Sequence, residues 1–280
     1  MMLWEFFMTF IKTPDGTSLF YKDWGSGDPV VFLHGWPLNA DMWEYQMVPL
    51  VRRGLRTIAF DRRGFGRSDQ PGGRYDYDVL ADDLASVLET LDLHDVTLVA
   101  FSMGGGEVAR YLSRHGSERI ARVVLVSAVT PFLVKSADNP DGVDRSVFDQ
   151  MVDQLQEDRP HFLVGFGKKL YGGGLLSSPV STQLLEWTGG MALLASPLAT
   201  LNCVRLFSET DFRGDMKAFD KPTLVIHGKS DATVPSELAA RRAAAAIAGA
   251  ELIEYEGAPH GLFYTEKDRL NADLLRFISA

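Results

Sequence analysis

Short, largely apolar runs recur along the chain, and more polar segments separate them. The runs lie at 29–33, 57–60, 96–100, 123–126, 223–226 and 252–255. Continuous apolar runs of this length are typical of strands buried on both faces, as in a parallel sheet. Upstream, two alternating segments flank the turn signal Pro14-Asp15-Gly16, which predicts a hairpin over roughly residues 9–24.

Helical patterns lie between most of these runs. Residues 78–91 place their apolar side chains on one face and acids opposite, and 105–115, 236–248 and about 268–279 predict further helices. Alternation of strands and helices with short loops indicates an α/β fold, in which helices cover both faces of a mostly parallel sheet.

The alternation stops between about Pro131 and Arg213, where helical fragments are separated by clusters of Gly, Pro and Ser. No strand pattern is convincing in this stretch. We therefore expect a helical cap inserted at 131–213 over one end of the sheet, with 1–130 and 214–280 forming the α/β core. A chain of 280 residues fits one such domain with an insertion.

The net charge of −9 argues against a nucleic-acid partner, because phosphate binding requires a basic surface. Cys203 is the only cysteine, so no intramolecular disulfide can form, and we expect it to be a small buried hydrophobe. No H-E-x-x-H motif or cysteine pair indicates a metal site.

The apolar N-terminus, Met1 to Met8, has no basic residues and no cleavage pattern, so it does not resemble a signal peptide. It is also too short to span a membrane. We expect a cytoplasmic protein without membrane association. Translation can also begin at Met8, which would make residues 1–7 an upstream addition.

Ser102 lies where a predicted strand ends and a helix begins. In this setting a serine can occupy a tight turn that exposes its hydroxyl, called a nucleophile elbow. The turn requires small residues two positions to either side, and these are Ala100 and Gly104. The alternative is a serine that only caps the following helix.

Asp231 and His260 each follow a later predicted strand. Flanking Gly and Pro place His260 in a loop, and Asp231 could alternatively cap the next helix. We interpret His34 and His227 as packing residues. The chain order Ser102, Asp231, His260 is the one found in α/β-hydrolases, so we predict a catalytic triad of nucleophile, orienting acid and base.

The segment His34-Gly35-Trp36-Pro37 follows the strand at 29–33 and supplies the second half of the expected oxyanion hole. The backbone N–H groups of Trp36 and Met103 would hold the oxyanion. Pro37 restricts the backbone of Trp36. We hypothesise that the Trp36 carbonyl thereby accepts a hydrogen bond from hydrogen peroxide; the alternative is that Pro37 only stiffens the loop.

The chain resembles the cofactor-free (non-haem) haloperoxidase, or perhydrolase, and aryl-esterase family of α/β-hydrolases. The matching segments cover nearly the whole chain from Met8 and include Lys22-Asp23-Trp24-Gly25, HGWP at 34–37, 59–68, Tyr75-Asp76-Tyr77, FSMGGGEVARY at 101–111, 138–142, 210–213 and 257–261.

The resemblance implies hydrolysis of small esters or lactones, and perhydrolysis of carboxylic acids with hydrogen peroxide to peracids that oxidise halide. It implies no cofactor and no metal, and we expect a homo-oligomer. By the same resemblance, the acyl pocket is lined by Trp36, Pro37, Met103, Val129, Phe166 and Leu170.

The sequence also bears on three other interpretations. Dehalogenases and epoxide hydrolases of the same fold use an aspartate nucleophile, against which Ser102 stands. The dinucleotide-binding pattern starting at Gly104 fails because position 109 is Ala109. A non-catalytic receptor for small molecules on a hydrolase scaffold can retain the triad and therefore remains open.

Overall fold

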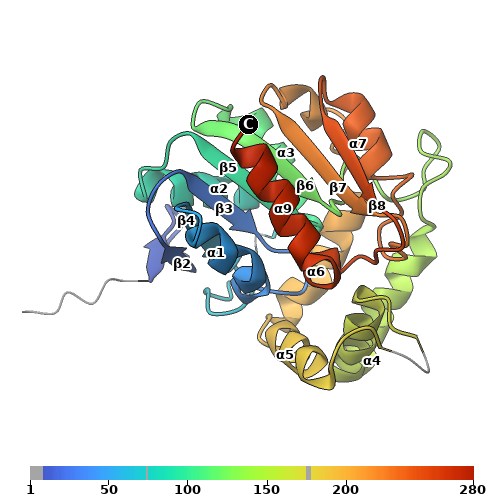
Figure 1. Cartoon of the computed structure of the whole chain (residues 1–280). Coiled ribbons are helices and arrows are strands. Elements are labelled where there is room, and N and C mark those ends of the chain that lie inside the picture. The colour runs from blue at the N-terminus through green and yellow to red at the C-terminus, as the bar shows by residue number, and fades with distance from the viewer. Residues whose placement is uncertain (1–8, 74, 175–177) are drawn as a thin grey trace, which may run out of the picture.

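The computed structural model of the chain describes residues 9–73, 75–174 and 178–280, so the N-terminal residues Met1 to Met8 lie outside it. The described residues form an eight-stranded sheet in the order β1-β2-β4-β3-β5-β6-β7-β8 (Figure 1). The strands are β1 (Phe10–Lys12), β2 (Ser18–Trp24), β3 (Pro29–Leu33), β4 (Arg56–Phe60), β5 (Val96–Phe101), β6 (Ile120–Val126), β7 (Thr223–Gly228) and β8 (Glu251–Tyr255). β1 pairs antiparallel with β2 and β2 pairs antiparallel with β4, while the other neighbours are parallel.

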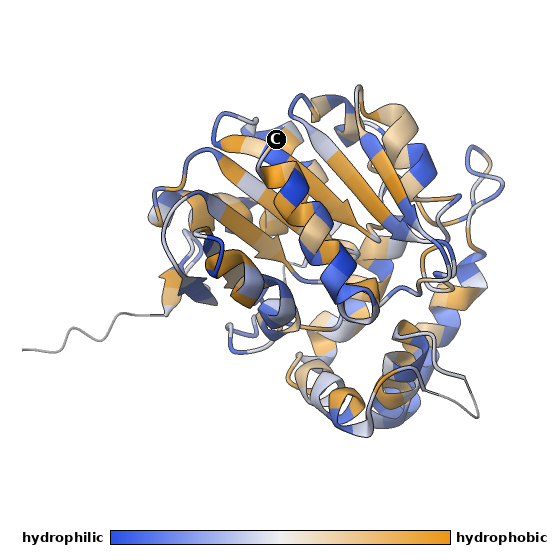
Figure 2. Ribbon diagram, viewed as in Figure 1, coloured by the Kyte–Doolittle hydropathy of each residue, from blue (hydrophilic) through white to orange (hydrophobic). Residues whose placement is uncertain are grey.

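Helices cover both faces of this sheet, as the alternation of patterns predicted. Strand β5 shows why, since Leu98 and Ala100 pack into one buried cluster and Val99 and Phe101 into another. Helices α2 (Tyr77–Thr90), α3 (Met103–His115) and α7 (Ala240–Ala246) contribute to the first cluster, and α1 (Glu44–Val51) and α9 (Lys267–Ile278) contribute to the second. Figure 2 shows the strands as largely hydrophobic between these two layers.

Between β6 and β7 the described residues form the α-helices α4 (Arg145–Leu170), α5 (Thr182–Leu193) and α6 (Pro197–Glu209), followed by the short 3-10 helix η2 (Asp215–Ala218). In Figure 1, α4 and α5 lie beyond the end of the sheet. Helix α4 is broken at Asp158, whose backbone is not helical (φ −148°, ψ 82°), because Pro160 lies two residues further on and disfavours the regular helix. Cys203 is fully buried in α6.

Two details of the fold differ from the patterns in the sequence. Helix α1 was not predicted, and α7 covers only part of the helix expected over 236–248. Leu238 and Ala239 both donate to the carbonyl of Pro235, so this stretch forms a turn before α7 begins. The last short helix, α8 (Leu262–Thr265), follows β8 directly.

Among the described residues, no single helix has both the length and the apolar composition that would let it cross a membrane.

Candidate active site

Ser102 lies between β5 and α3 with a left-handed backbone (φ 52°, ψ −115°), which is rare for a residue with a side chain. Its backbone is held on both sides. The N–H donates to the carbonyl of Val126 (3.0 Å), and the Ser102 carbonyl accepts from Gly105 (3.0 Å) and Val129 (3.2 Å). These bonds keep the serine in the sharp turn that the sequence predicted.

The close packing around this turn requires glycine at two positions. A Cβ atom on Gly104 would lie 2.9 Å from the carbonyl oxygen of Leu33, at the end of β3. A Cβ atom on Gly35 would lie 2.5 Å from the ring of Phe101 and 3.1 Å from the Cβ of Ser102. Residues 34–37 therefore run directly against the serine.

A chain of hydrogen bonds joins Ser102, His260 and Asp231. His260 Nε2 lies 3.0 Å from Ser102 Oγ, and His260 Nδ1 lies 2.6 Å from Asp231 Oδ2. Because an ionised carboxylate only accepts, Nδ1 carries the proton and Nε2 is left to accept from the serine hydroxyl. All three residues are buried, and the ring of Phe101 packs against His260 with centroids 4.8 Å apart.

Asp231 is held by four donors. Its Oδ1 accepts from the N–H groups of Thr233 (2.9 Å) and Val234 (2.8 Å), while Oδ2 faces His260. Burial by itself would raise the pKa of Asp231, but the charge of His260 and hydrogen bonds from His227 and His260 hold that pKa well below its usual range. Asp231 therefore stays ionised at neutral pH and caps a turn at the same time.

The place of His227 in its predicted strand indicates a packing role, but in the structure its ring also contacts the carboxylate of Asp231. His227 Nε2 lies 2.8 Å from the carbonyl of Val234 and 3.2 Å from Asp231 Oδ2. A carbonyl only accepts, so His227 Nε2 carries a proton and donates toward Asp231 as well. In the sequence, the spacing of four residues between His227 and Asp231 was the signal that could have predicted this contact.

Two backbone N–H groups can serve the expected oxyanion hole. Among the described residues, no hydrogen bond from the N–H of Trp36 is found. Met103 is the first residue of α3, where N–H groups have no partner within the helix. The Trp36 side chain is fixed separately, because its indole Nε1 donates to the carbonyl of Thr200 (3.0 Å).

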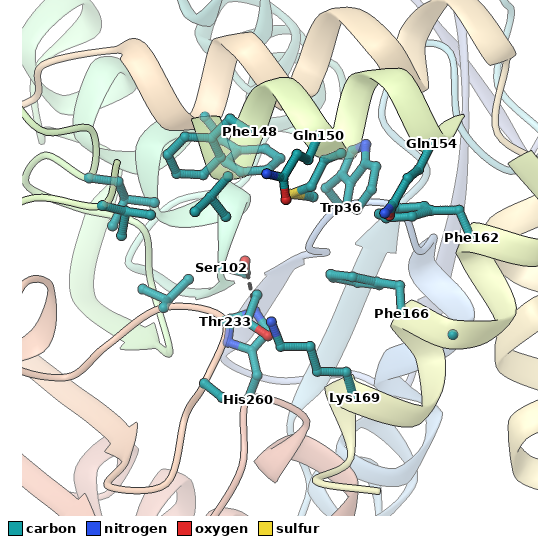
Figure 3. A pocket seen from close by; sticks show the side chains of 18 of the residues that line it. Trp36, Ser102, Phe148, Gln150, Gln154, Phe162, Phe166, Lys169, Thr233 and His260 are labelled. Carbon is teal, nitrogen blue, oxygen red and sulfur yellow. Dashed lines mark hydrogen bonds between the residues drawn. The ribbon is translucent and has the colours of Figure 1, made fainter. Parts of the chain in front are cut away.

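A cavity of about 1010 Å³ opens above Ser102 and His260, between the sheet and the cap helices (Figure 3). Of the pocket residues that the resemblance implied, Trp36, Val129 and Phe166 line it. Met103 and Pro37 are buried and are not among its lining residues.

Leu170 differs from its expected place in the acyl pocket. It is fully buried in the last turn of α4 and belongs to the cluster on the α1 and α9 side of the sheet. Its carbonyl accepts from the N–H of Gly261 (2.6 Å), which ties the end of α4 to the loop that carries His260. It therefore supports that loop and does not face the cavity.

Several polar residues of the cavity were missed by sequence reasoning. Helix α4 contributes the polar Gln150, Gln154 and Lys169 as well as the aromatic Phe162, and the loop after β7 contributes Thr233. Their spacing of three or four residues within each half of α4 was a signal. The break at Asp158 interrupts that periodicity, so the two halves do not combine into one recognisable face.

A buried ion pair holds the loop at 34–37 in place. The Arg62 guanidinium bonds to Glu107 on α3 and donates to the carbonyl of His34 (2.6 Å). The Arg62 N–H donates to His34 Nε2 (3.0 Å), so His34 carries its proton on Nδ1, 3.0 Å from the carbonyl of Gly35. Burial, and then the charge of Arg62, lowers the pKa of His34 well below its usual value, so this ring is neutral.

Comparisons with known proteins show which family the chain resembles over most of its length. Residues 28–267 match the alpha/beta hydrolase fold family. The chain is 44% identical to a non-heme chloroperoxidase of Kitasatospora aureofaciens, over 97% of this chain and 100% of the relative. It is 41% identical to a bifunctional esterase/perhydrolase of Acinetobacter calcoaceticus, over 97% and 99%. The crystal structure of a bromoperoxidase from Bacillus anthracis superposes with a TM-score of 0.94 at 44% identity, covering 97% of this chain and 99% of that one.

The buried pair of Arg62 and Glu107 generates a testable prediction. Glu107→Gln leaves a buried guanidinium charge without a counter-charge, so the free energy of unfolding in urea should fall by about 3–5 kcal/mol. In the double variant Arg62→Met with Glu107→Met, both charges are gone, and much of that stability should return. Turnover of p-nitrophenyl acetate should stay about tenfold low, because the carbonyl of His34 has lost its donor.

Measuring both stability and turnover separates a role of the Arg62–Glu107 pair in folding from a role in positioning the loop at 34–37. A double variant that regains both stability and full turnover would mean that the pair serves folding alone and does not position the loop at 34–37.

Proposed function

The chain belongs to the α/β-hydrolase family, whose fold its residues 28–267 match, and on this basis we propose that it hydrolyses small carboxylic esters or lactones through an acyl-enzyme on Ser102. The observation that carries the proposal is the hydrogen-bonded chain from Asp231 through His260 to Ser102, at the floor of a cavity. The names of the relatives support the same class of reaction.

In the proposed mechanism each of the three groups has its own step. His260 Nε2 takes the proton of Ser102 as Oγ attacks the ester carbonyl carbon, and it then protonates the departing alkoxide, which leaves as the alcohol. Water attacks the acyl-enzyme in the second half, with His260 again as base, and releases the carboxylic acid and free serine. Asp231 keeps the imidazole in the tautomer that can accept and stabilises it while it is charged.

The N–H groups of Trp36 and Met103 hold the negative oxygen of each tetrahedral intermediate in this proposal. Each such donor contributes about 3 kcal/mol in comparable enzymes. Support comes from the close packing of Gly35 against Ser102, which puts the Trp36 peptide next to the reacting atom. The positive end of α3 lies at the same point.

Perhydrolysis uses the same acyl-enzyme with a different second substrate. Hydrogen peroxide attacks the acyl carbon in place of water, and the products are a peracid and free Ser102. The acyl group comes from a carboxylic acid or an ester, and the released peracid oxidises halide in solution. The chain needs no metal or cofactor for this sequence of steps. Its cytoplasmic location and homo-oligomeric state stay predictions from the sequence.

Substitutions of the triad test the proposed mechanism. Ser102→Ala and His260→Ala should each lower kcat for p-nitrophenyl acetate by about a thousandfold or more, and Asp231→Ala by less. Combining the substitutions should add little, because the three residues act as one unit. If Ser102→Ala kept near-normal turnover, Ser102 would not be the nucleophile, and a receptor role would gain support.

Chelation tests whether perhydrolysis proceeds without metal. Bromination in the presence of acetate and hydrogen peroxide should survive prolonged dialysis against EDTA and should vanish in Ser102→Ala. Loss of bromination on chelation, with recovery on adding back a metal, would contradict the proposal.

A substitution at Pro37 tests whether this residue favours perhydrolysis over hydrolysis. The proline restricts the backbone of Trp36, and the proposal is that the Trp36 carbonyl accepts a hydrogen bond from hydrogen peroxide. Pro37→Leu should lower the ratio of perhydrolysis to hydrolysis, measured with one acyl donor. Parallel changes in both rates would mean that Pro37 only stiffens the loop.

A further inference from the structure

The second half of α4 lines the catalytic cavity with His161 and with three side chains that share one face of the helix. Phe162, Phe166 and Lys169 follow one another at intervals of four and three residues, which places them on one face of the helix. In Figure 3, Lys169 extends from α4 into the cavity on the side where Thr233 and His260 lie. Two aromatic rings and one ammonium group thus lie along one face of α4, at the wall of the cavity.

Lys169 has no ion-pair partner within residues 9–73, 75–174 and 178–280. Glu157 and Asp158 also line the cavity, but Asp158 stands eleven residues away, about 16 Å along the helix at 1.5 Å per residue. That separation exceeds the Debye length of about 8 Å in physiological salt. The charge of Lys169 is therefore not neutralised by these acids.

The position of Lys169 at the C-terminal end of α4 does not explain why its side chain extends into the cavity. Lys168 and Lys169 both lie in the last turn of α4, where positive charge is favourable. Lys168 is equally exposed, but it does not line the cavity. The helix end accounts for two lysines, whereas only one of them faces the site.

The surroundings of Lys169 suit the charged end of a substrate. Trp36 and Phe166 pack edge to face with ring centroids 5.1 Å apart and offer an apolar surface for methylene groups. Lys169 also borders a second cavity of about 770 Å³, where Lys267 and Glu266 add one charge of each sign and the other lining residues are largely polar or glycine. A carboxylate held there can stay partly hydrated while the ester end of the same molecule reaches Ser102.

We propose that Lys169 binds a carboxylate at the far end of the acyl group, so that the preferred substrates are half-esters of dicarboxylic acids. The inference rests on the proposed function, because it names the substrate class of that same site. The reaction is ordinary ester hydrolysis: the anion of a monomethyl ester and water give the dicarboxylate, methanol and a proton released to solvent, with Ser102 acylated in between.

The test compares charged and neutral substrates of equal length. Monomethyl succinate, glutarate, adipate and suberate are each paired with the methyl ester of the monocarboxylic acid that has the same number of carbons. The quantity measured is the ratio of kcat/KM for the charged ester to kcat/KM for the neutral one. In the unaltered protein this ratio should peak at one chain length.

Lys169→Met should lower that peak ratio by about tenfold, mainly through KM, since a hydrogen bond to a charged group is lost. Lys169→Arg should retain most of it, and Lys169→Glu should reverse the preference. Lys168→Met is the matched control, because it removes the same charge from the same helix end, and it should leave the ratio within about twofold of its original value.

The outcomes separate the inference from the function on which it rests. If neutral esters are turned over and the turnover depends on Ser102, but Lys169→Met leaves the ratio unchanged, only the carboxylate site is wrong. An equal fall in the ratio for Lys168→Met and Lys169→Met would also overturn it, because the effect would then come from overall charge. Absence of Ser102-dependent turnover for every ester would overturn both proposals.

Discussion

The left-handed backbone of Ser102 is the constraint on which the rest of the site depends. A serine with φ 52° is strained, and it persists only because neighbouring groups hold it from both sides. The turn brings α3 so close to β3 that Gly104 is needed where the two meet, and Gly35 is needed where the loop after β3 passes the serine. Ser102, the start of α3 and the loop at 34–37 thus form one packed unit, and the Arg62–Glu107 pair holds that loop through the carbonyl of His34.

Much of this unit could be predicted from the sequence, since parallel strands bring their carboxyl ends to one edge of the sheet. That rule is why Ser102, Asp231 and His260, far apart in the chain, were expected to meet. Contacts within the loops were less predictable. The histidine at 227 looked like a core residue, because nothing in a strand pattern tells which face a terminal side chain takes.

The sequence predicted helices between β6 and β7, but it did not predict which helix faces line the cavity. The break at Asp158 shifts the register of α4, so the inward face of its second half does not follow from that of its first. Leu170, which the family resemblance placed in the acyl pocket, is found in the core, while Lys169, one position earlier, lines the cavity. A change of one residue along a helix rotates a side chain by about 100°, which is enough to exchange the two roles.

Helix α4 is one continuous segment between β6 and β7, and this affects how enzymes of this kind can diversify. The groups assigned to bond making and breaking all come from the ends of the sheet, whereas the cavity wall opposite them comes largely from one helix. Variation in that one segment can change which molecules fit without disturbing the reacting atoms. Selection, natural or in the laboratory, can therefore act on α4 as an exchangeable module, and its two halves, joined at Asp158, can vary independently of each other.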